Sequence, residues 1–455
     1  MTVRQIMQTL AHTLLPLSEF TQRRKQFIQQ MPSNSIALFA AAKEVTRSND
    51  TEYPFCQNKN FYYLTGFNEP DAVLVLIKAE CEQSILFCRD KDQQAEIWHG
   101  RRVGASKAQQ EYGFTQCFTL AELDYQLPDL IANKTHLLYC QASDADFEQQ
   151  IHTWLHKVKQ QIKKGIKAPK CLMDASDIVH EMRLIKSEHE LALMRQVNDI
   201  SVQAHRRAME KTRIGLYEYQ IEAELLHEFA RNGARFAAYN SIVAGGDNAN
   251  ILHYTDNSDV LQNNELLLID AGGELAGYAA DITRTFPING KFNNQQKALY
   301  ELVLTAQNET IAAIKPEVTF AQLNDIANKI LTKGLFELGI LTGKLADLMA
   351  EKACKKYFIH GLGHWLGLDV HDVGDYQIDK NKQQLRPFQA GMVLTIEPGI
   401  YIPQHDTDVA EKWRGIGIRI EDNIVVTDQG HENLSKNAPK SVADIEAVMK
   451  QAVPY

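Results

Sequence analysis

The sequence predicts a mixed α/β (α+β) protein of two domains, a smaller one over residues 1–176 and a larger one over residues 177–455. At 455 residues the chain exceeds the length that one hydrophobic core usually serves, so two or three domains are expected. Helix and strand patterns alternate up to Ala168-Pro169, where the pattern breaks. Beyond this break, helices followed by strands that end in acidic residues occur twice, which indicates an internal duplication.

Composition argues against several classes of protein. The chain has 48 Lys and Arg against 57 Asp and Glu, a net charge of −9, which argues against nucleic acid or an anionic membrane as the main partner. Residues 1–20 show no signal-peptide pattern, and no run reaches the roughly 18 apolar residues of a membrane span. The seven cysteines are scattered without a C-x-x-C pair, which favours reduced thiols and a cytoplasmic protein.

The first domain is expected to be an α/β unit built on short buried strands. Apolar runs bounded by turn residues predict the strands, and longer amphipathic segments predict the helices. Strands 72–77 and 84–87 flank the charged segment 78–83, a pattern typical of a hairpin. The other expected elements are helix 20–31, strand 35–40, strand 136–140 and helix 144–164, whose basic end is interpreted as a solvated face.

Helices open the second domain and recur in its middle. Ser187 and Glu190 form a capping box, and Leu193, Val197 and Ile200 follow at helical spacing. The apolar stripes of these helices are interpreted as ordinary core. The further expected helices are 218–232, 294–315, 320–339 and 342–355.

Two aspartates are expected to face each other across a hairpin of the second domain. Residues 265–270 are apolar except for the final Asp270, and a turn-rich segment separates them from a second strand that contains Asp281. If the hairpin is centred between Leu275 and Ala276, the two aspartates are cross-strand partners about 5 Å apart. Carboxylates at that distance repel unless a cation or a proton lies between them. A different register, or an aspartate that only caps the turn, is the alternative.

Residues 360–372 contain three histidines and two aspartates among three glycines. His360 and His364 have the four-residue spacing of zinc-binding helices. A helix is disfavoured because two glycines lie between them, and each costs about 1 kcal/mol against Ala. We therefore expect a loop that leads into a short strand over 366–370. One histidine alone is usually structural, but three in a loop whose glycines allow close approach of a ligand indicate a site.

Two later segments repeat the pattern of an apolar strand with an acid. Residues 391–396 lead directly to Glu397. Residues 415–426 alternate, with isoleucines on one face and Arg419 and Glu421 on the other. An exposed polar face is one interpretation of Arg419 and Glu421, and the bulky isoleucine face is as typical of a packed sheet.

The acids of these strands, together with one histidine of residues 360–372, have the composition of a two-metal site. The acids are Asp270, Asp281, Glu397 and Glu421. Two divalent cations would nearly neutralise four carboxylates, whereas one cation would leave buried carboxylates unpaired. Oxygen-rich ligation with one nitrogen suits Mn²⁺ better than a structural zinc site, and two such ions about 3.5–4 Å apart can deprotonate a shared water for hydrolysis. The remaining histidines would be free to bind substrate carbonyls or transfer protons: His253, His360 and His371.

The second domain resembles the pita-bread metallopeptidases in the order Asp, Asp, His, Glu, Glu and in the string H-G-L-G-H-W-L-G-L-D-V-H-D at 360–372. The chain is most similar to the aminopeptidase P (Xaa-Pro aminopeptidase) family, from about Phe20 to about Val448. Further similar segments are 44–48, 63–70, 96–102, 251–255, 281–287 and 414–422. The resemblance implies that residues 177–455 form a pita-bread catalytic domain with a pseudo-twofold internal repeat, and that residues 1–176 shape substrate access and oligomerisation.

Carried over residue by residue, the resemblance implies a set of metal ligands. They are Asp270, Asp281, His364, Glu397 and Glu421. Asp281 and Glu421 would bridge two ions, and Asp270 would chelate one of them. His364 and Glu397 would complete the other, and Glu397 would also guide the proton of the bridging hydroxide.

The resemblance also implies residues that act on the substrate. His253 and His371 would stabilise the tetrahedral intermediate and the scissile amide. His360 would contact the substrate near its proline. Arg419 would hold the hydrogen-bond network beside one bridging glutamate, and Tyr401 occupies a family position near the metals.

The family that the chain resembles removes an N-terminal residue from peptides whose second residue is proline. This bond resists general aminopeptidases because it is a tertiary amide of restricted geometry. We therefore expect an Xaa-Pro aminopeptidase with two divalent ions, Mn²⁺ in particular, that acts on peptides and forms a dimer or tetramer. One alternative is a prolidase acting on Xaa-Pro dipeptides. The other is a non-enzymatic binding protein on the same fold, which the presence of all five ligands disfavours.

Overall fold

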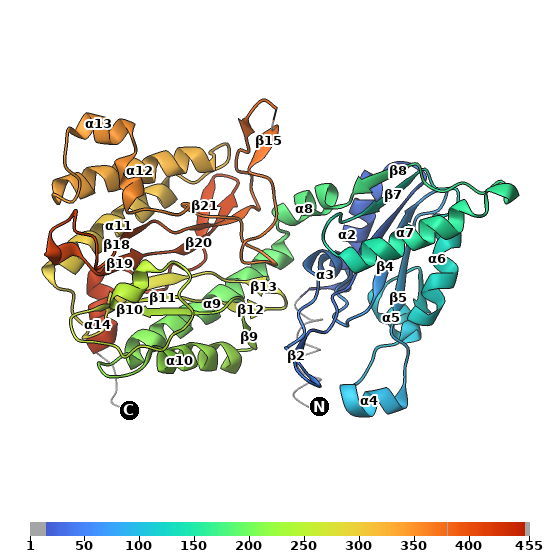
Figure 1. Cartoon of the computed structure of the whole chain (residues 1–455), viewed down its shortest axis with the longest axis horizontal. Helices are drawn as coiled ribbons and strands as arrows, with labels where there is room; N and C mark the ends of the chain where they lie inside the picture. The colour runs from blue at the N-terminus through green and yellow to red at the C-terminus, as the bar shows by residue number, and fades with distance from the viewer. Residues whose placement is uncertain (1–14, 380, 451–455) are drawn as a thin grey trace. The chain divides into compact units, whose positions relative to one another are not determined.

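The computed structural model describes residues 15–379 and 381–450, and the chain divides into two compact units, Met1–Arg183 and Leu184–Tyr455 (Figure 1). This division falls at the end of helix α8 (Ser176–Leu184), whereas the sequence placed it at the start of that helix, between residues 176 and 177. None of the helices in the described ranges is long and apolar enough to cross a membrane.

The first unit is built on one six-stranded sheet of order β6-β5-β4-β1-β7-β8. Its central strands β1, β4 and β5 are antiparallel neighbours, so the predicted hairpin of β4 and β5 is confirmed, and the outer strands add in parallel. The strands are β1 (Ser35–Ala40), β4 (Val73–Lys78), β5 (Gln83–Cys88), β6 (Gln116–Thr119), β7 (His136–Tyr139) and β8 (Cys171–Asp174). A separate small hairpin pairs β2 (Thr46–Ser48) with β3 (Thr51–Glu52).

The helices α6 (Leu123–Ile131) and α7 (Ala145–Lys159) pack on this sheet through one apolar cluster that includes Ile36, Val75, Leu127 and Trp154. The predicted helix over 144–164 ends earlier, at Lys159, and a short 3₁₀ turn η2 (Ile162–Lys164) follows it. The helices are α2 (Leu17–Gln30), α3 (Lys59–Thr65), α4 (Gln93–His99), α5 (Ala105–Tyr112), α6 (Leu123–Ile131, preceded by η1, Leu120–Glu122) and α7 (Ala145–Lys159).

Long helices form the outer layer of the second unit. The predicted capping box of α9 is confirmed, because the Ser187 side chain accepts from the backbone of Glu190 and the Glu190 side chain accepts from the backbone of Ser187. The predicted helix over 342–355 is interrupted, because Lys352 has a left-handed conformation with φ of 52°. The elements are α9 (Glu188–Lys211), α10 (Glu218–Arg231), α11 (Asn294–Ala312), α12 (Phe320–Glu337), α13 (Leu345–Ala350), η4 (Ala353–Lys356) and α14 (Val442–Lys450).

Small antiparallel sheets form the inner layer of the second unit, and each half of the unit has long helices followed by such sheets. The first half has the sheets β10-β11-β14 and β13-β12-β9, and the second half has β17-β20-β21 and β18-β19. Their bounds are β9 (Phe236–Ala237), β10 (Ile242–Gly245), β11 (Leu266–Asp270), β12 (Gly273–Leu275), β13 (Tyr278–Ala279), β14 (Thr283–Pro287), β17 (Val393–Ile396), β18 (Gly399–Ile402), β19 (Ile416–Arg419), β20 (Asp422–Thr427) and β21 (Gly430–Asn433). A bridge between Thr283 and Glu421 joins the two halves.

The remaining elements of the second unit are short. A hairpin of β15 (Gln377–Asp379) and β16 (Gln384–Leu385) follows the histidine-containing segment. Two 3₁₀ turns, η3 (Gly246–Asn250) and η5 (Glu411–Trp413), precede His253 and β19 respectively.

Candidate metal centre

The four predicted acids lie where the chain passes from one small sheet to another. Asp270 ends β11 just before β12, and Asp281 lies between β13 and β14. Glu397 lies between β17 and β18, and Glu421 lies between β19 and β20. In each case the flanking strands belong to different sheets. The strict alternation of side chains in a regular strand therefore ends at each acid, which leaves its carboxylate free to turn toward the others.

The predicted register of the first hairpin is wrong. Asp270 pairs with Thr283 rather than with Asp281. The turn is formed by Ala276 and Gly277, whose φ values are 50° and 87°, so the hairpin is centred one residue later than predicted. Positive φ at both turn residues is the type I′ geometry that suits the twist of a tight hairpin.

Asp270 and Asp281 nevertheless meet at one side chain, that of Tyr239. Its hydroxyl oxygen lies 2.6 Å from Asp270 Oδ1 and 2.5 Å from Asp281 Oδ1. A hydroxyl has one proton and donates it to one carboxylate at a time. The second short contact is therefore accounted for by a proton on that carboxylate or by a nearby cation.

Residues 366–370 do not form the predicted strand. The backbone turns back on itself, because Asp372 N–H donates to Trp365 O at 2.9 Å and Gly367 N–H donates to Asp369 O at 3.1 Å. A buried ion pair, 3.0 Å from Lys186 Nζ to Asp372 Oδ2, anchors this loop to the start of the second unit.

The loop places His364 against the acids. Its Nε2 lies 3.3 Å from Asp281 Oδ2 and 3.8 Å from Glu397 Oε1. Its Nδ1 lies 2.9 Å from Trp365 O, and because a carbonyl only accepts, Nδ1 carries a proton there. This arrangement is typical of a metal-binding histidine, whose second ring nitrogen is fixed by a backbone carbonyl.

Glu421 is buried at the base of the cluster. Its Oε2 accepts a hydrogen bond from the Thr283 hydroxyl at 2.8 Å, while its Oε1 is buried without a hydrogen-bond partner. Ligand atoms of Asp281, His364 and Glu421 all lie within 4.8 Å of one another. A buried carboxylate oxygen without a donor is costly, and a cation held by these three residues removes that cost.

Arg419 organises the other side of the cluster with three donors. Its NH2 donates to Asp270 Oδ2 at 2.7 Å, its Nε donates to the Thr283 hydroxyl at 3.1 Å, and its NH1 donates to the Tyr401 hydroxyl at 2.8 Å. Tyr401 in turn lies 2.7 Å from Nε2 of His360. Hydrogen bonds thus connect Arg419 with Asp270 directly and with His360 through the Tyr401 hydroxyl.

The three histidines that were not expected to bind metal have different environments. Nδ1 of His360 lies 2.6 Å from Gly361 O, and burial together with the charge of Arg419 lowers the pKa of His360 to about 3. The His371 ring is exposed and lies 4.3 Å from the His364 ring, centroid to centroid. Partial burial of the ring and the charge of His364 nevertheless lower the pKa of His371. His253 is exposed, and its charge contributes to lowering the pKa of both other histidines.

Burial and mutual repulsion raise the pKa of three of the four acids. Burial and the neighbouring aspartates raise the pKa of Glu397 to about 7 and that of Glu421 well above its ordinary value. Burial and the charge of Asp281 raise the pKa of Asp270. Burial alone would raise the pKa of Asp281, but the hydrogen bond and charge of His364 lower it. So many acids in one place are stable only with protons or cations among them.

The side-chain exposures show which side of the cluster is open. Glu397 and His364 are 17% and 15% exposed, whereas Asp281 is 7% exposed. The whole Glu421 residue is 1% exposed. The Asp270 side chain is 13% exposed, so the cluster is open along Glu397, His364 and Asp270 and closed at Asp281 and Glu421. The five predicted ligands fit a divalent-metal centre, because they combine oxygen-rich donors, one oriented imidazole and an unsatisfied buried oxygen.

Sequence reasoning missed three residues of this cluster. Tyr239 lies far along the chain from both aspartates that it contacts, and nothing in its surroundings marks it. Thr283 lies in a segment of family resemblance without an assigned role. Asn423 clamps the backbone of Asp281: its Oδ1 accepts from Asp281 N–H at 2.9 Å and its Nδ2 donates to Asp281 O. Its position two residues after Glu421 in a buried strand was the one signal available.

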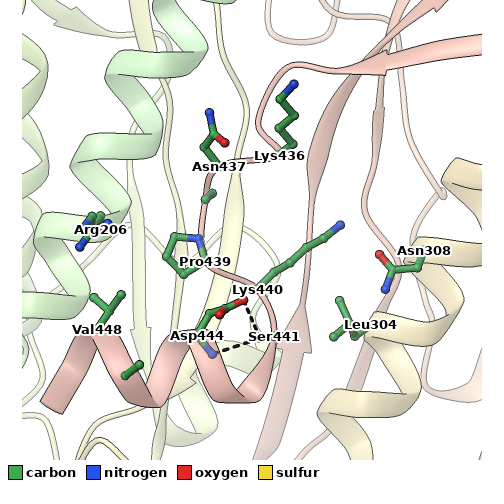
Figure 2. Close-up of a pocket in the computed structure, with 12 residues that line it drawn as sticks. Arg206, Leu304, Asn308, Lys436, Asn437, Pro439, Lys440, Ser441, Asp444 and Val448 are labelled. Carbon is green, nitrogen blue, oxygen red and sulfur yellow. Dashed lines mark hydrogen bonds between the residues drawn. The ribbon is translucent and has the colours of Figure 1, made fainter.

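A separate pocket of about 520 Å³ lies where residues 436–441 lead into α14 (Figure 2). Its lining includes the cations Arg206, Lys436 and Lys440, and the five predicted metal ligands lie outside it. Lys440 Nζ donates to Asp422 Oδ2 at 2.8 Å, and Arg206 pairs with Glu210 at 3.0 Å. Two of its cations are thus already compensated, and the pocket has no part in the acid cluster.

Family models match both units of the chain. The model of "Metallopeptidase family M24" matches residues 192–428. The model of "Aminopeptidase P, N-terminal domain" matches residues 20–139.

Known proteins are similar to this chain along most of its length. Xaa-Pro aminopeptidase of Escherichia coli (strain K12) is 45% identical over 436 residues, which cover 95% of this chain and 98% of that protein. Xaa-Pro aminopeptidase 3 of Homo sapiens is 36% identical, covering 89% of this chain and 79% of that protein. The solved structure of Pseudomonas aeruginosa aminopeptidase PepP has a TM-score of 0.94 at 43% identity, with 96% of this chain and 99% of that chain covered. Zn-substituted E. coli aminopeptidase P in complex with product also has a TM-score of 0.94, at 44% identity, covering 97% of this chain and 100% of that chain.

Proposed function

The chain belongs to metallopeptidase family M24, and on this premise we propose that it is an Xaa-Pro aminopeptidase, which hydrolyses the bond between the first residue of a peptide and a proline in second position. The predicted fold class, an N-terminal α/β domain followed by a pita-bread domain, is confirmed by the likeness to aminopeptidase P structures. The observation that carries the function is the complete set of four acids and one histidine in a chain 45% identical to an Xaa-Pro aminopeptidase over nearly its whole length.

The metal centre requires divalent ions, and we propose Mn²⁺ as the native metal. Asp270, Asp281, His364, Glu397 and Glu421 would hold two ions, with Asp281 and Glu421 shared between them. The predominance of carboxylate oxygens supports Mn²⁺ over a structural zinc site. When bound, such ions supply a nucleophile from water at neutral pH and polarise the scissile carbonyl.

The side chains around the centre would position the substrate and move its proton. Glu397 is partly exposed at the edge of the cluster, so it would accept a proton from water and return it to the leaving amine. His253 and His371 are exposed beside the cluster and would donate hydrogen bonds to the scissile amide and the tetrahedral intermediate. His360 would contact the substrate near its proline. Tyr401 would hold His360 in place and shape the substrate site, and Arg419 would hold the network of Asp270 and Tyr401.

Three peptides test the proposed activity against its alternatives. With metal-loaded protein, we expect Xaa-Pro-Xaa to be cleaved after its first residue, Xaa-Ala-Xaa to be cleaved far more slowly, and the Xaa-Pro dipeptide to be a poor substrate. Cleavage of the dipeptide alone would indicate a prolidase. Absence of cleavage of every Xaa-Pro bond would indicate a binding protein.

Metal-stripped protein given Mn²⁺, Co²⁺ or Zn²⁺ in turn identifies the activating ion. Full activity with Zn²⁺ alone would contradict the proposal that Mn²⁺ is the native metal.

We further propose that the N-terminal domain, residues 1–176, shapes substrate access and mediates a dimer or tetramer. The match of residues 20–139 to the N-terminal domain of aminopeptidase P supports this assignment. Light scattering on the full chain measures the assembly, and a monomer at micromolar concentration would contradict it.

The seven free cysteines support a reducing, cytoplasmic location.

A further inference from the structure

The side chain of Thr283 connects the guanidinium of Arg419 with the buried carboxylate of Glu421. The Thr283 side chain is fully buried at the start of β14, and its hydroxyl oxygen lies 3.1 Å from Arg419 Nε and 2.8 Å from Glu421 Oε2. We propose that Thr283 is a positioning residue, whose hydroxyl holds the Glu421 carboxylate in the orientation needed for metal binding. The proposal rests on the proposed metal centre and assigns a role to a residue outside its ligand set.

The direction of the two hydrogen bonds follows from the groups themselves. The guanidinium of Arg419 only donates, so the Thr283 oxygen accepts from Nε. The single hydroxyl proton then points to its other short contact, the Glu421 Oε2 atom. Arg419 thereby polarises the hydroxyl that it contacts, and a hydrogen bond to a carboxylate is among the stronger ones.

The backbone of Glu421 is fixed independently of this hydroxyl. Glu421 N–H donates to Thr283 O at 3.0 Å, and Arg284 NH1 donates to Glu421 O at 2.7 Å. These bonds involve main-chain atoms of Glu421, and substitution of the Thr283 side chain leaves them in place. What the hydroxyl controls is the torsion of the Glu421 side chain.

Occupation of Oε2 by the hydroxyl leaves Oε1 for another partner. Oε1 is buried without a hydrogen bond in the described structure, and Glu421 shares a 4.8 Å cluster of ligand atoms with Asp281 and His364. Without the hydroxyl, the carboxylate can rotate, and Arg419 Nε loses its acceptor. A buried unpaired donor is costly, so we expect the Arg419 guanidinium to shift toward Glu421. There it would compete with a metal ion for the Glu421 carboxylate.

Two substitutions separate the hydroxyl from the shape of the residue. Thr283→Val keeps the branched shape and removes the donor, and Thr283→Ser keeps the donor. We would titrate Mn²⁺ into metal-stripped full-length protein by calorimetry. Loss of a residue that orients a metal ligand typically weakens metal binding about 10- to 100-fold, and we expect this loss for Thr283→Val in at least one of the two binding events. Thr283→Ser is expected to bind within about threefold of the unchanged protein, since a retained hydroxyl rescues the orientation.

Thr285 offers a matched control on the same strand. It is equally buried, but its hydroxyl contacts only the backbone of Arg419: it donates to Arg419 O at 2.9 Å and accepts from Arg419 N–H at 3.2 Å, and it donates to no carboxylate. Thr285→Val is therefore expected to lower stability as much as Thr283→Val does, while Mn²⁺ affinity stays within about threefold, because the Thr285 hydroxyl contacts no metal ligand. Equal loss of Mn²⁺ affinity in both variants would assign a merely structural role to Thr283 and overturn the proposal.

The remaining outcomes also decide the proposal. Two Mn²⁺ ions bound by Thr283→Val with unchanged affinity would contradict it. If Thr283→Val does not fold, Thr283→Ala replaces it, and the same loss of Mn²⁺ affinity is expected. Because the titration measures metal and not turnover, a chain that binds Mn²⁺ as expected but cleaves no Xaa-Pro peptide would contradict the proposed activity and leave the role of Thr283 supported.

Discussion

Arg419 makes it possible for several carboxylates to share one small volume. It contacts Asp270 directly, and it reaches Glu421 through Thr283 and His360 through Tyr401. Each intermediate hydroxyl accepts from the guanidinium and donates onward, so one cation sets the direction of two chains of hydrogen bonds. One cation does not balance four acids, however, which is why the cluster requires divalent ions or protons in addition.

Glu421 is the acid whose removal is expected to matter most, because it would bridge both ions and is the most deeply buried. Glu421→Ala should lower bound Mn²⁺ to one ion or fewer, and activity on an Xaa-Pro-Xaa peptide should fall by about 100-fold or more. Metal analysis of the dialysed protein and an activity assay check the two effects together.

Glu432 is a suitable control for this substitution. It is 35% exposed at its side chain and pairs with Arg195 at 2.8 Å on the surface, so Glu432→Ala should bind two ions and cost at most about 1 kcal/mol of stability. Two bound ions with retained activity in Glu421→Ala would refute the bridging role.

At the scale of elements, the metal centre depends on the close approach of the two strands of the hairpin that carries Asp270 and Asp281. Gly272 lies between Asp270 and Asp281 in the folded hairpin, and a Cβ placed there would lie 1.7 Å from the carbonyl oxygen of Ala280. That atom belongs to backbone and cannot rotate away. The strands must separate before any side chain fits at this position.

We therefore expect Gly272→Ala to lower the free energy of unfolding by about 1–3 kcal/mol or more and to weaken Mn²⁺ binding, because it moves Asp270 and Asp281 apart. Gly430 is the control: a Cβ there meets no atom within 4 Å, and Gly430→Ala should change stability by less than about 0.5 kcal/mol. Urea unfolding and Mn²⁺ titration measure both effects. Unchanged Mn²⁺ affinity in Gly272→Ala would show that the strand spacing is not what positions the acids.

The same elements show what could be predicted from sequence. The strands and their terminal acids were predicted because apolar runs that end in a carboxylate are visible locally. The register at Asp270 was not, because Ala276 adopts a positive φ that its residue type gives no reason to expect. The prediction of a strand over 366–370 was wrong, because the alternating apolar residues there belong to a loop that folds back on itself. Tyr239 and Asn423 were missed because their roles arise only when distant segments meet.

For the molecule as a whole, an excess of acids makes metal-free and metal-loaded protein respond differently to pH. In the metal-free protein, burial raises the pKa of Glu397 from 4.5 to about 7, and the hydrogen bond and charge of Asp281 overcome burial to raise that of His364 from 6.5 to about 9. Both groups bind their protons more tightly in the folded state than in the unfolded state. The protons on these two groups therefore stabilise the folded state fully at a pH below the pKa of the unfolded state. This stabilisation is lost as the pH rises through the pKa of the folded state.

We expect the free energy of unfolding of the metal-free protein to fall as pH rises, between 4.5 and about 7 through Glu397 and between 6.5 and about 9 through His364. Bound divalent ions replace these protons, so the Mn²⁺-loaded protein should gain stability relative to the metal-free protein across the same range. Urea midpoints at a series of pH values, with chelator or with Mn²⁺, measure the difference. Glu397→Gln should reduce the decline below about pH 7, since an amide does not titrate. A metal-free protein whose stability is constant or rises over this range would show that the acids are balanced by other means, and a divalent centre would then lose its electrostatic rationale.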